Sequence, residues 1–140
     1  MDGFDLQRFV DAQDSGGTYR HAVEELRRGR KTSHWMWFVF PQIAGLGSSA
    51  MAQRYAISGL EEARAYLAHP VLGARLRECG TTLLETKTDD PVAVFGPIDA
   101  QKLRSSMTLF HLAAPDDPVF KAVLDRYFKG EADPETHRLV

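Results

Sequence analysis

Apolar residues recur three and four positions apart along most of the chain, and glycines and prolines separate the runs. This spacing is typical of amphipathic helices, whereas the strict apolar–polar alternation of half-buried strands is almost absent. The runs predict helices over residues 6–13, 19–28, 60–67, 70–84, 100–112 and 118–128, with shorter ones near 51–57 and after 134. We therefore expect an all-α fold, a single compact domain spanning residues 1–140, built from about seven or eight short helices.

Caps and breakers mark where these helices begin and end. The side chains expected to cap a helix N-terminus are Asp5, Thr18, Ser33, Asp99 and Asp117. Gly29 and Gly130 are expected to end helices, and Pro70 to open one, because a missing N–H costs nothing in the first turn. The connections between these signals are short, which supports one domain.

Both tryptophans and two phenylalanines fall within residues 35–40. This stretch is either a short helix begun by Ser33 or a strand, because periodicity cannot decide in so short a run. Helical spacing would turn Trp35 and Phe38 inward together. It would place Trp37 on another face, where the indole can line a cleft and stack on a ring-shaped ligand.

Composition narrows the function classes without naming one. A formal net charge of −2 provides no overall field that would attract nucleic acid or a membrane surface, so we expect neither as a partner. The single cysteine, Cys79, excludes an internal disulfide and fits a reducing compartment. The dispersed histidines have no metal-ligand spacing, and neither a signal peptide nor a membrane span is evident. We expect a soluble cytoplasmic protein without a metal or cofactor.

Polar residues lead into the aromatic stretch. Arg30 and Lys31 supply two cations, while Ser33 and His34 supply a hydroxyl and an imidazole. If Ser33 begins a helix, the free N–H groups and the helix dipole would hold a phosphate or carboxylate together with the cations. The alternative is a capping serine beside two solvated cations, and adjacency to the aromatics leaves the two interpretations near parity.

Two further polar segments are candidates to meet this one. Loop 45–49 is rich in glycine and serine and offers amides and hydroxyls to a ligand, although it matches no nucleotide-binding fingerprint. Within 102–108, Lys102, Ser105 and Ser106 share one side of a helix. Hydroxyl residues inside a helix are locally unfavourable, which indicates either a functional site or a small-residue face that lets two helices approach closely.

Several blocks of sequence occur in a recognisable order. They are FVDAQ at 9–13, GRKTSHWMWFVFPQ at 29–42, GLGSS at 45–49, EARAYL at 62–67, HPVLGARL at 69–76 and KLRSSMTLF at 102–110. Together they resemble the bacterial domain-of-unknown-function 1810 family, whose members are sometimes labelled calpastatin. The resemblance covers nearly the whole chain and implies a small all-α domain without bringing an activity. Residues 69–96, with KLRSSM, are also similar to the NADAR group, which is linked to ADP-ribose chemistry.

We hypothesise that the protein binds or acts on a small anionic molecule, such as a nucleotide or an ADP-ribose-like ligand. The candidates for general acid–base chemistry are Glu62 and His34. The candidates for ligand binding are Arg30, Lys31, Ser33, Trp37, Gln42, Ser48, Ser49, Tyr55, Lys102, Arg104, Ser105 and Ser106. The alternative is a non-catalytic module that binds a protein or peptide, which predicts an exposed apolar strip along residues 35–40. The oligomeric state stays open.

Overall fold

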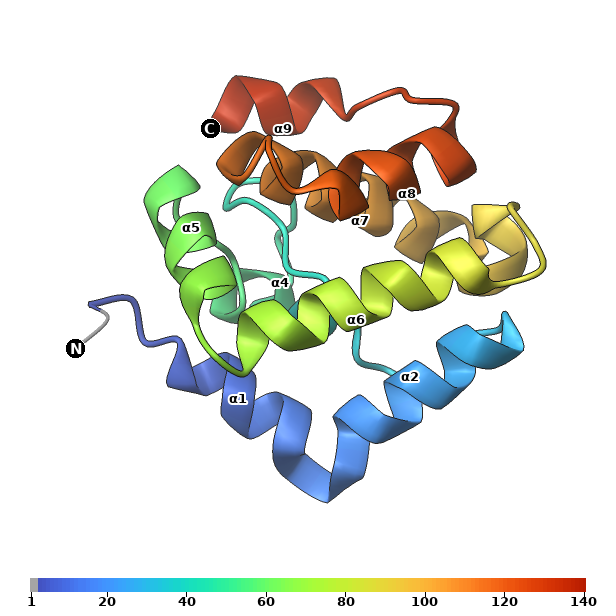
Figure 1. Ribbon diagram of the computed structural model, residues 1–140. Coiled ribbons are helices and arrows are strands. Elements are labelled where there is room, and N and C mark those ends of the chain that lie inside the picture. Colours follow the sequence, from blue (N-terminus) through green and yellow to red (C-terminus); the bar gives the residue numbers. More distant parts are fainter. Residues whose placement is uncertain (1–2) are drawn as a thin grey trace.

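Helices form nearly all the regular structure in the computed structural model, which describes residues 3–140 (Figure 1). In chain order they are α1 (Gln7–Asp14), the 3₁₀ turn η1 (Ser15–Gly17), α2 (Thr18–Arg28), α3 (Met36–Val39), α4 (Ala50–Arg54), α5 (Leu60–Ala68), α6 (Leu72–Glu85), α7 (Pro91–Ala113), α8 (Pro118–Phe128) and α9 (Pro134–Leu139). The described residues contain no strand, and one isolated parallel β-bridge joins Ile43 to Ile57. The all-α prediction is confirmed.

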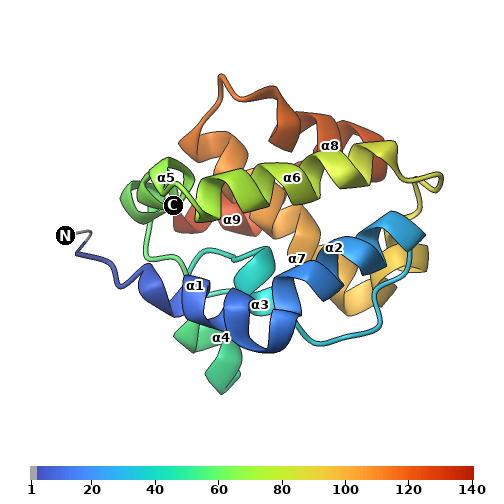
Figure 2. The same ribbon diagram turned by 60° about the horizontal axis from the view of Figure 1, so that its bottom comes forward.

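Helix α6 crosses the middle of the molecule. It packs against α2 on one side and α8 on the other, while α7 packs against α5, α8 and α9 (Figures 1 and 2). One cluster of buried side chains runs through these elements and includes Trp35, Tyr66 and Phe110. Because a single core joins helices from α1 to α8, the described chain is one compact domain.

Several predicted helix ends are confirmed. Gly29 ends α2 in the left-handed conformation, with φ of 74°. Asp117 caps α8 by accepting a hydrogen bond from the backbone N–H of Val119. Asp133, which was not among the predicted caps, caps α9 in the same way by accepting from the N–H of Thr136. At these positions the local sequence is sufficient to predict the helix end, because the hydrogen-bond partner lies within one turn.

Three predicted caps in the first third of the chain are wrong. Leu6 rather than Asp5 precedes α1, and Gly17 rather than Thr18 precedes α2. The hydroxyl of Thr18, already inside the helix, donates to a carbonyl of the preceding turn. Ser33 does not start α3, which is a single helical turn preceded by Trp35.

The starts of α6 and α7 also differ from prediction. Pro70 lies before α6, and the imidazole Nδ1 of His69 accepts from the first N–H groups of that helix. Asp90 caps α7, so Asp99 lies inside the helix and caps nothing. Gly96 and Pro97 kink α7, because Gly96 has φ of 78° and helix continues on both sides.

Candidate functional site

A buried carboxylate, Glu25 of α2, organises the polar lead-in to the tryptophans. It accepts hydrogen bonds from the N–H of Thr32 (2.7 Å) and from the N–H and hydroxyl of Ser33 (2.9 and 2.6 Å). The indole N–H of Trp35 donates to it at 3.0 Å. Burial alone would raise the pKa of Glu25, but these donors outweigh it and lower the pKa from 4.5 to about 2. The predicted anion site on free N–H groups at Ser33 is therefore wrong, because Glu25 already occupies them.

Asp99 joins the polar residues 30–34 to the polar segment 102–108. The sequence alone could not place these two segments relative to each other. Its Oδ2 lies 2.9 Å from Lys31 Nζ, and its Oδ1 lies 3.6 Å from Lys102 Nζ. Lys31 also lies 5.0 Å from the ring centroid of Trp35, and Lys102 lies 5.1 Å from that of Trp37. Exposure is 8% for the Lys31 side chain and 24% for that of Lys102. Of the two, Lys102 keeps the charge that a ligand can reach.

The hydroxyls within residues 102–108 hold the segment that leads into α9. Ser105 Oγ donates to Asp133 Oδ2 at 2.8 Å, and Thr108 Oγ1 accepts from the Asp133 N–H at 2.9 Å. Burial would raise the pKa of Asp133, but hydrogen bonds from the hydroxyls of Thr136 and Ser105 lower it. The hydroxyls of Ser105 and Thr108 thus have a structural partner, the buried Asp133 at the start of α9.

Arg104 and Ser106 also serve the fold. Arg104 donates to the carbonyls of Glu131 (2.8 Å) and Ala132 (2.7 Å), which fixes the same turn. Ser106 is fully buried, and its hydroxyl has no hydrogen-bond partner within residues 3–140. Neither of these predicted ligand-binding residues lines the cleft described next.

Beside the Lys31–Asp99–Lys102 junction lies an open cleft of about 550 Å³, between loop 45–49, α7 and α9. The lining residues are Gln42, Leu46, Gly47, Ser48, Ser49, Ala52, Ile98, Gln101, Lys102, Ser105, Asp133 and Glu135. The cleft therefore gathers five predicted ligand-binding residues from two distant segments, namely Gln42, Ser48, Ser49, Lys102 and Ser105. Glycine is required at position 47, because a Cβ there would lie 2.5 Å from the Ala52 Cβ.

The wall of the cleft mixes apolar and polar groups. Leu46, Ala52 and Ile98 are apolar, and the Ile98 side chain is 73% exposed at the rim. Lys102 is the single cation among the described residues that line the cleft. Glu135, one of two lining carboxylates, pairs with a neighbouring arginine of α9. This distribution suits a ligand with one negative group near Lys102 better than a highly charged one.

Glu62, predicted as a general acid–base group, is held in a structural ion pair. It is 3% exposed, and its Oε2 accepts from Arg8 at 3.0 Å. Its Oε1 accepts from the N–H of Ser58 at 2.8 Å, just before α5. Arg8 donates to four backbone carbonyls as well, so the pair anchors the chain around residues 54–58. Glu62 does not line the cleft.

The remaining predicted residues also lie outside the cleft lining. Tyr55 is buried, with ring centroids 5.8 Å from Phe9 and 5.3 Å from Phe38. His34 and Arg30 are exposed on the loop before α3. Stacking on Tyr55 is excluded by these neighbours, and the structure does not bring His34 to the cleft.

The apolar strip that a protein-binding groove requires is absent from residues 35–40. Five of these six side chains are buried, as predicted for Trp35, Phe38 and Phe40. Trp37 is partly buried, and the Lys102 ammonium lies over its ring. The aromatic stretch is thus mostly core, with one indole at the edge of the site.

Sequence reasoning missed three residues that shape the site: Glu25, Gln101 and Asp133. Glu25 carried a usable signal, since it lies three residues after Ala22 on the apolar face of α2. The sequence placed Asp133 only just before a possible last helix, and its bond to Ser105 depends on tertiary packing. Gln101, exposed on α7, carried no signal distinguishing it from any surface amide.

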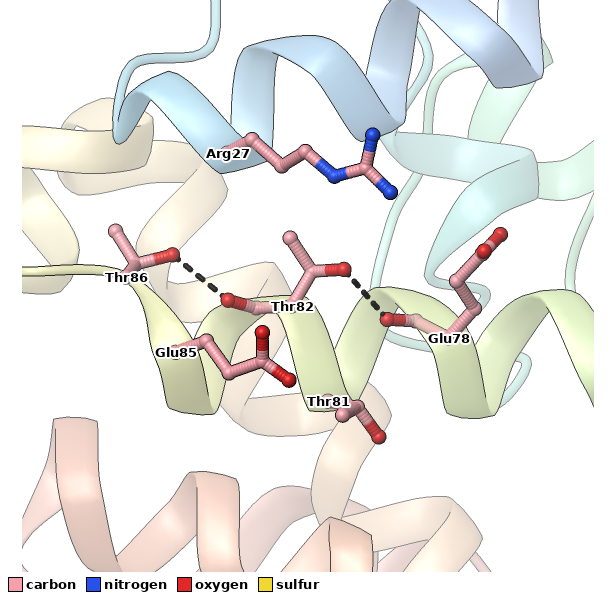
Figure 3. A pocket seen from close by; sticks show the side chains of 6 residues that line it. All are labelled: Arg27, Glu78, Thr81, Thr82, Glu85 and Thr86. Atoms are coloured by element: carbon pink, nitrogen blue, oxygen red, sulfur yellow. Dashed lines mark hydrogen bonds between the residues drawn. The ribbon is translucent and has the colours of Figure 1, made fainter.

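A second hollow, of about 460 Å³, lies between α2 and α6 (Figure 3). It is lined by Arg27, Glu78, Thr81, Thr82, Glu85 and Thr86, none of which the sequence singled out. The hydroxyls of Thr82 and Thr86 donate to carbonyls one turn earlier in α6, both at 2.8 Å. These threonines are thus bonded to their own helix.

Residues 3–140 contain no helix that combines the length and the apolar character needed to cross a membrane. Nor does this part of the chain bring three His, Cys, Asp or Glu side chains together in a way that could hold a metal ion.

Comparisons with known proteins identify a family and a solved structure whose descriptions name no activity. The model of a family described as a protein of unknown function (DUF1810) matches residues 3–140. The chain is similar to the conserved hypothetical protein Rv1873 from Mycobacterium tuberculosis, known from a crystal structure. The identity is 52%, the match covers 99% of this chain and 97% of that one, and the TM-score is 0.94. No curated protein matches the chain.

Proposed function

Because the chain belongs to the DUF1810 family of unknown function, we propose from its own cleft that it binds a small anionic molecule of the nucleotide or ADP-ribose class. One observation carries this proposal: the cleft gathers Lys102 with polar groups from residues 42–49. A concave site with an apolar wall and a few converging polar groups is the usual form of a small-molecule pocket. Its volume of about 550 Å³ is within the range of such pockets.

Each part of the cleft has a distinct role in this proposal. Lys102 pairs with the anionic group of the ligand, in competition with Asp99. The hydroxyls of Ser48 and Ser49 donate to the same group, and the Gln42 amide offers both a donor and an acceptor to a base edge.

The charge of the cleft selects among ligands of this class. Lys102 is the one cation in the described lining, and Asp133 and Glu135 add negative charge to the same wall. A monophosphate or carboxylate therefore suits the site better than the diphosphate of ADP-ribose. We expect a nucleoside monophosphate to bind more tightly than ADP-ribose.

The proposal is one of binding and includes no catalytic step. Glu62 and His34 do not line the cleft. Asp133, which does, is committed to the hydrogen bonds of Ser105 and Thr136. We place the binding in the cytoplasm, because the buried, unpaired thiol of Cys79 fits a reducing compartment.

A thermal-shift panel tests this function. Nucleoside monophosphates, ADP-ribose, ribose 5-phosphate and simple carboxylates are compared with chloride at equal ionic strength. Binding to the native state raises the melting temperature in a concentration-dependent way. We expect a saturable rise with at least one phosphate monoester, and a panel without any rise would overturn the proposal.

A further inference from the structure

Cations without partners gather where α2 ends. Six cationic side chains have no carboxylate, carbonyl or aromatic-ring partner among the described residues. They are Arg20, Arg27, Arg28, Arg30, Lys87 and Lys129. Four of the six lie close together in sequence or at neighbouring helix ends. Arg27 and Arg28 are in the last turn of α2, Arg30 follows that helix, and Lys87 is in the loop after α6. Like charges in one place repel, so the cluster favours an anion that neutralises it.

Three of these side chains, those of Arg27, Arg28 and Lys87, line a hollow of about 580 Å³ beside Gly29, which we call the α2-end hollow. Its lining carries three cations, Arg27, Arg28 and Lys87, against one carboxylate, Glu85. Arg27 and Glu85 also line the hollow of Figure 3, so the two hollows are neighbours. In that view Arg27 extends along the groove with no bond to the residues drawn. Its guanidinium is thus available to a ligand.

The backbone around the α2-end hollow is fixed by tertiary contacts. Arg126 of α8 donates to the carbonyls of Thr86 and Thr88, and the Thr86 hydroxyl donates to the Leu26 carbonyl at 3.2 Å. Gly29 adopts φ of 74°, and a Cβ there would lie 3.3 Å from a methyl carbon of Thr86. A fixed frame lets the flexible cations close on a ligand without reorganising the loop.

We propose that the α2-end hollow is a second anion-binding site, separate from the cleft at Lys102, that takes the phosphate or diphosphate group of a small molecule or ion. Arginine guanidinium groups hold phosphate oxygens through two parallel hydrogen bonds, and a lysine adds a point charge. The cleft at Lys102 offers one cation, whereas this hollow offers three, so it accepts the more highly charged group. The two sites therefore differ in preference, and neither depends on the other.

Titration with sodium pyrophosphate at constant ionic strength, followed by amide NMR shifts, tests this site. We expect saturable shifts at Gly29, Lys87 and Thr88, and weaker binding of inorganic phosphate. The variant Arg27→Gln/Arg28→Gln/Lys87→Gln should bind at least about tenfold more weakly. The matched control Arg20→Gln/Lys121→Gln/Lys129→Gln loses the same number of charges elsewhere and should bind like the wild type.

Additional titrations distinguish the second site from its alternatives. ADP that gives the same shifts as pyrophosphate identifies a nucleoside diphosphate as a fitting source of the group. Lys102→Ala should leave these shifts unchanged, and their loss in that variant would assign the anion to the cleft and overturn the second site. Equal shifts with chloride, or wild-type binding by the triple variant, would also overturn it. In those cases the cations merely complement the C-terminal dipoles of α2 and α6.

Discussion

Lys31 and Asp99 form the ion pair that ties the loop before α3 to helix α7, with 2.9 Å between Nζ and Oδ2. The backbone N–H of Lys31 donates to the carbonyl of Val94 at 2.8 Å, so the loop is attached to α7 at two points. The second oxygen of Asp99 faces Lys102 in the cleft. One carboxylate thus sets both the position of the loop and the charge of the candidate site.

Replacing Asp99 by asparagine should reveal the cost of leaving Lys31 without its carboxylate partner. The ammonium of Lys31 is nearly buried, and an unpaired buried charge is strongly destabilising, whereas Asp99 is partly solvated. We expect Asp99→Asn to lower the free energy of unfolding in urea by about 2 kcal/mol. Asp89→Asn, at an exposed position on the loop before α7, is the control and should change it by less than about 0.5 kcal/mol. Equal effects in the two variants would argue against the ion pair.

Glu25 provides a prediction about pH. Its pKa is about 2 in the folded protein and 4.5 ordinarily, so folding favours the ionised form. The stabilisation is fully present above the higher value and disappears as the pH falls through the lower one. Glu25→Gln should therefore cost about 3 kcal/mol near neutral pH, because the amide nitrogen cannot accept a hydrogen bond. The difference from wild type should shrink between pH 4.5 and about 2.

Urea unfolding at a series of pH values measures this difference. Glu24→Gln is the matched control, because Glu24 is the adjacent residue of α2 and is exposed. That variant should track the wild type throughout. A Glu25→Gln penalty that does not change with pH would contradict the assigned role of the carboxylate.

Ser105 and Ser106 are adjacent in α7 but differ in hydrogen bonding, since only the Ser105 hydroxyl has a partner among the described residues. Ser105 donates to the buried Asp133, so Ser105→Ala should cost about 1.5 kcal/mol and speed amide exchange in α9. Ser106 is equally buried but its hydroxyl has no partner within the described chain, so Ser106→Ala should be neutral or stabilising. Urea unfolding and hydrogen exchange check both. The reverse order of the two effects would mean that the hydroxyls have other partners.

The fold was predictable because its signals are local. Helical spacing, the helix end at Gly29 and the cap at Asp117 each involve residues within one or two turns, and the structure has the corresponding helices. The predicted caps at Ser33 and Asp99 are wrong because contacts with other helices, or an earlier helix start, are not visible in the local sequence. Ser33 looked like a helix start, but Glu25 of the previous helix takes its donors. Asp99 looked like a cap, but α7 begins earlier and leaves its carboxylate to Lys31.

The candidate site was predictable in part. Lys102 and the serines of loop 45–49 were singled out for their local chemistry, and the structure brings them to one cleft. The sequence could not show that Lys31 and Ser33 are already engaged by Asp99 and Glu25, because those contacts join different helices. Nor could it distinguish Ser105, whose hydroxyl is hydrogen-bonded, from Ser106, whose hydroxyl has no partner among the described residues, since neighbouring positions on a helix meet different surroundings.

Titration calorimetry of Lys102→Ala with a nucleoside monophosphate tests the central proposal most directly. Lys121→Ala is the control, because Lys121 is an exposed lysine of α8 whose loss changes the net charge equally. Removal of the one cation in the described cleft lining should weaken binding by about tenfold or more, with unchanged stability in urea. The control should bind like the wild type. Equal affinity in Lys102→Ala and the wild type would contradict the assignment of the cleft as the binding site.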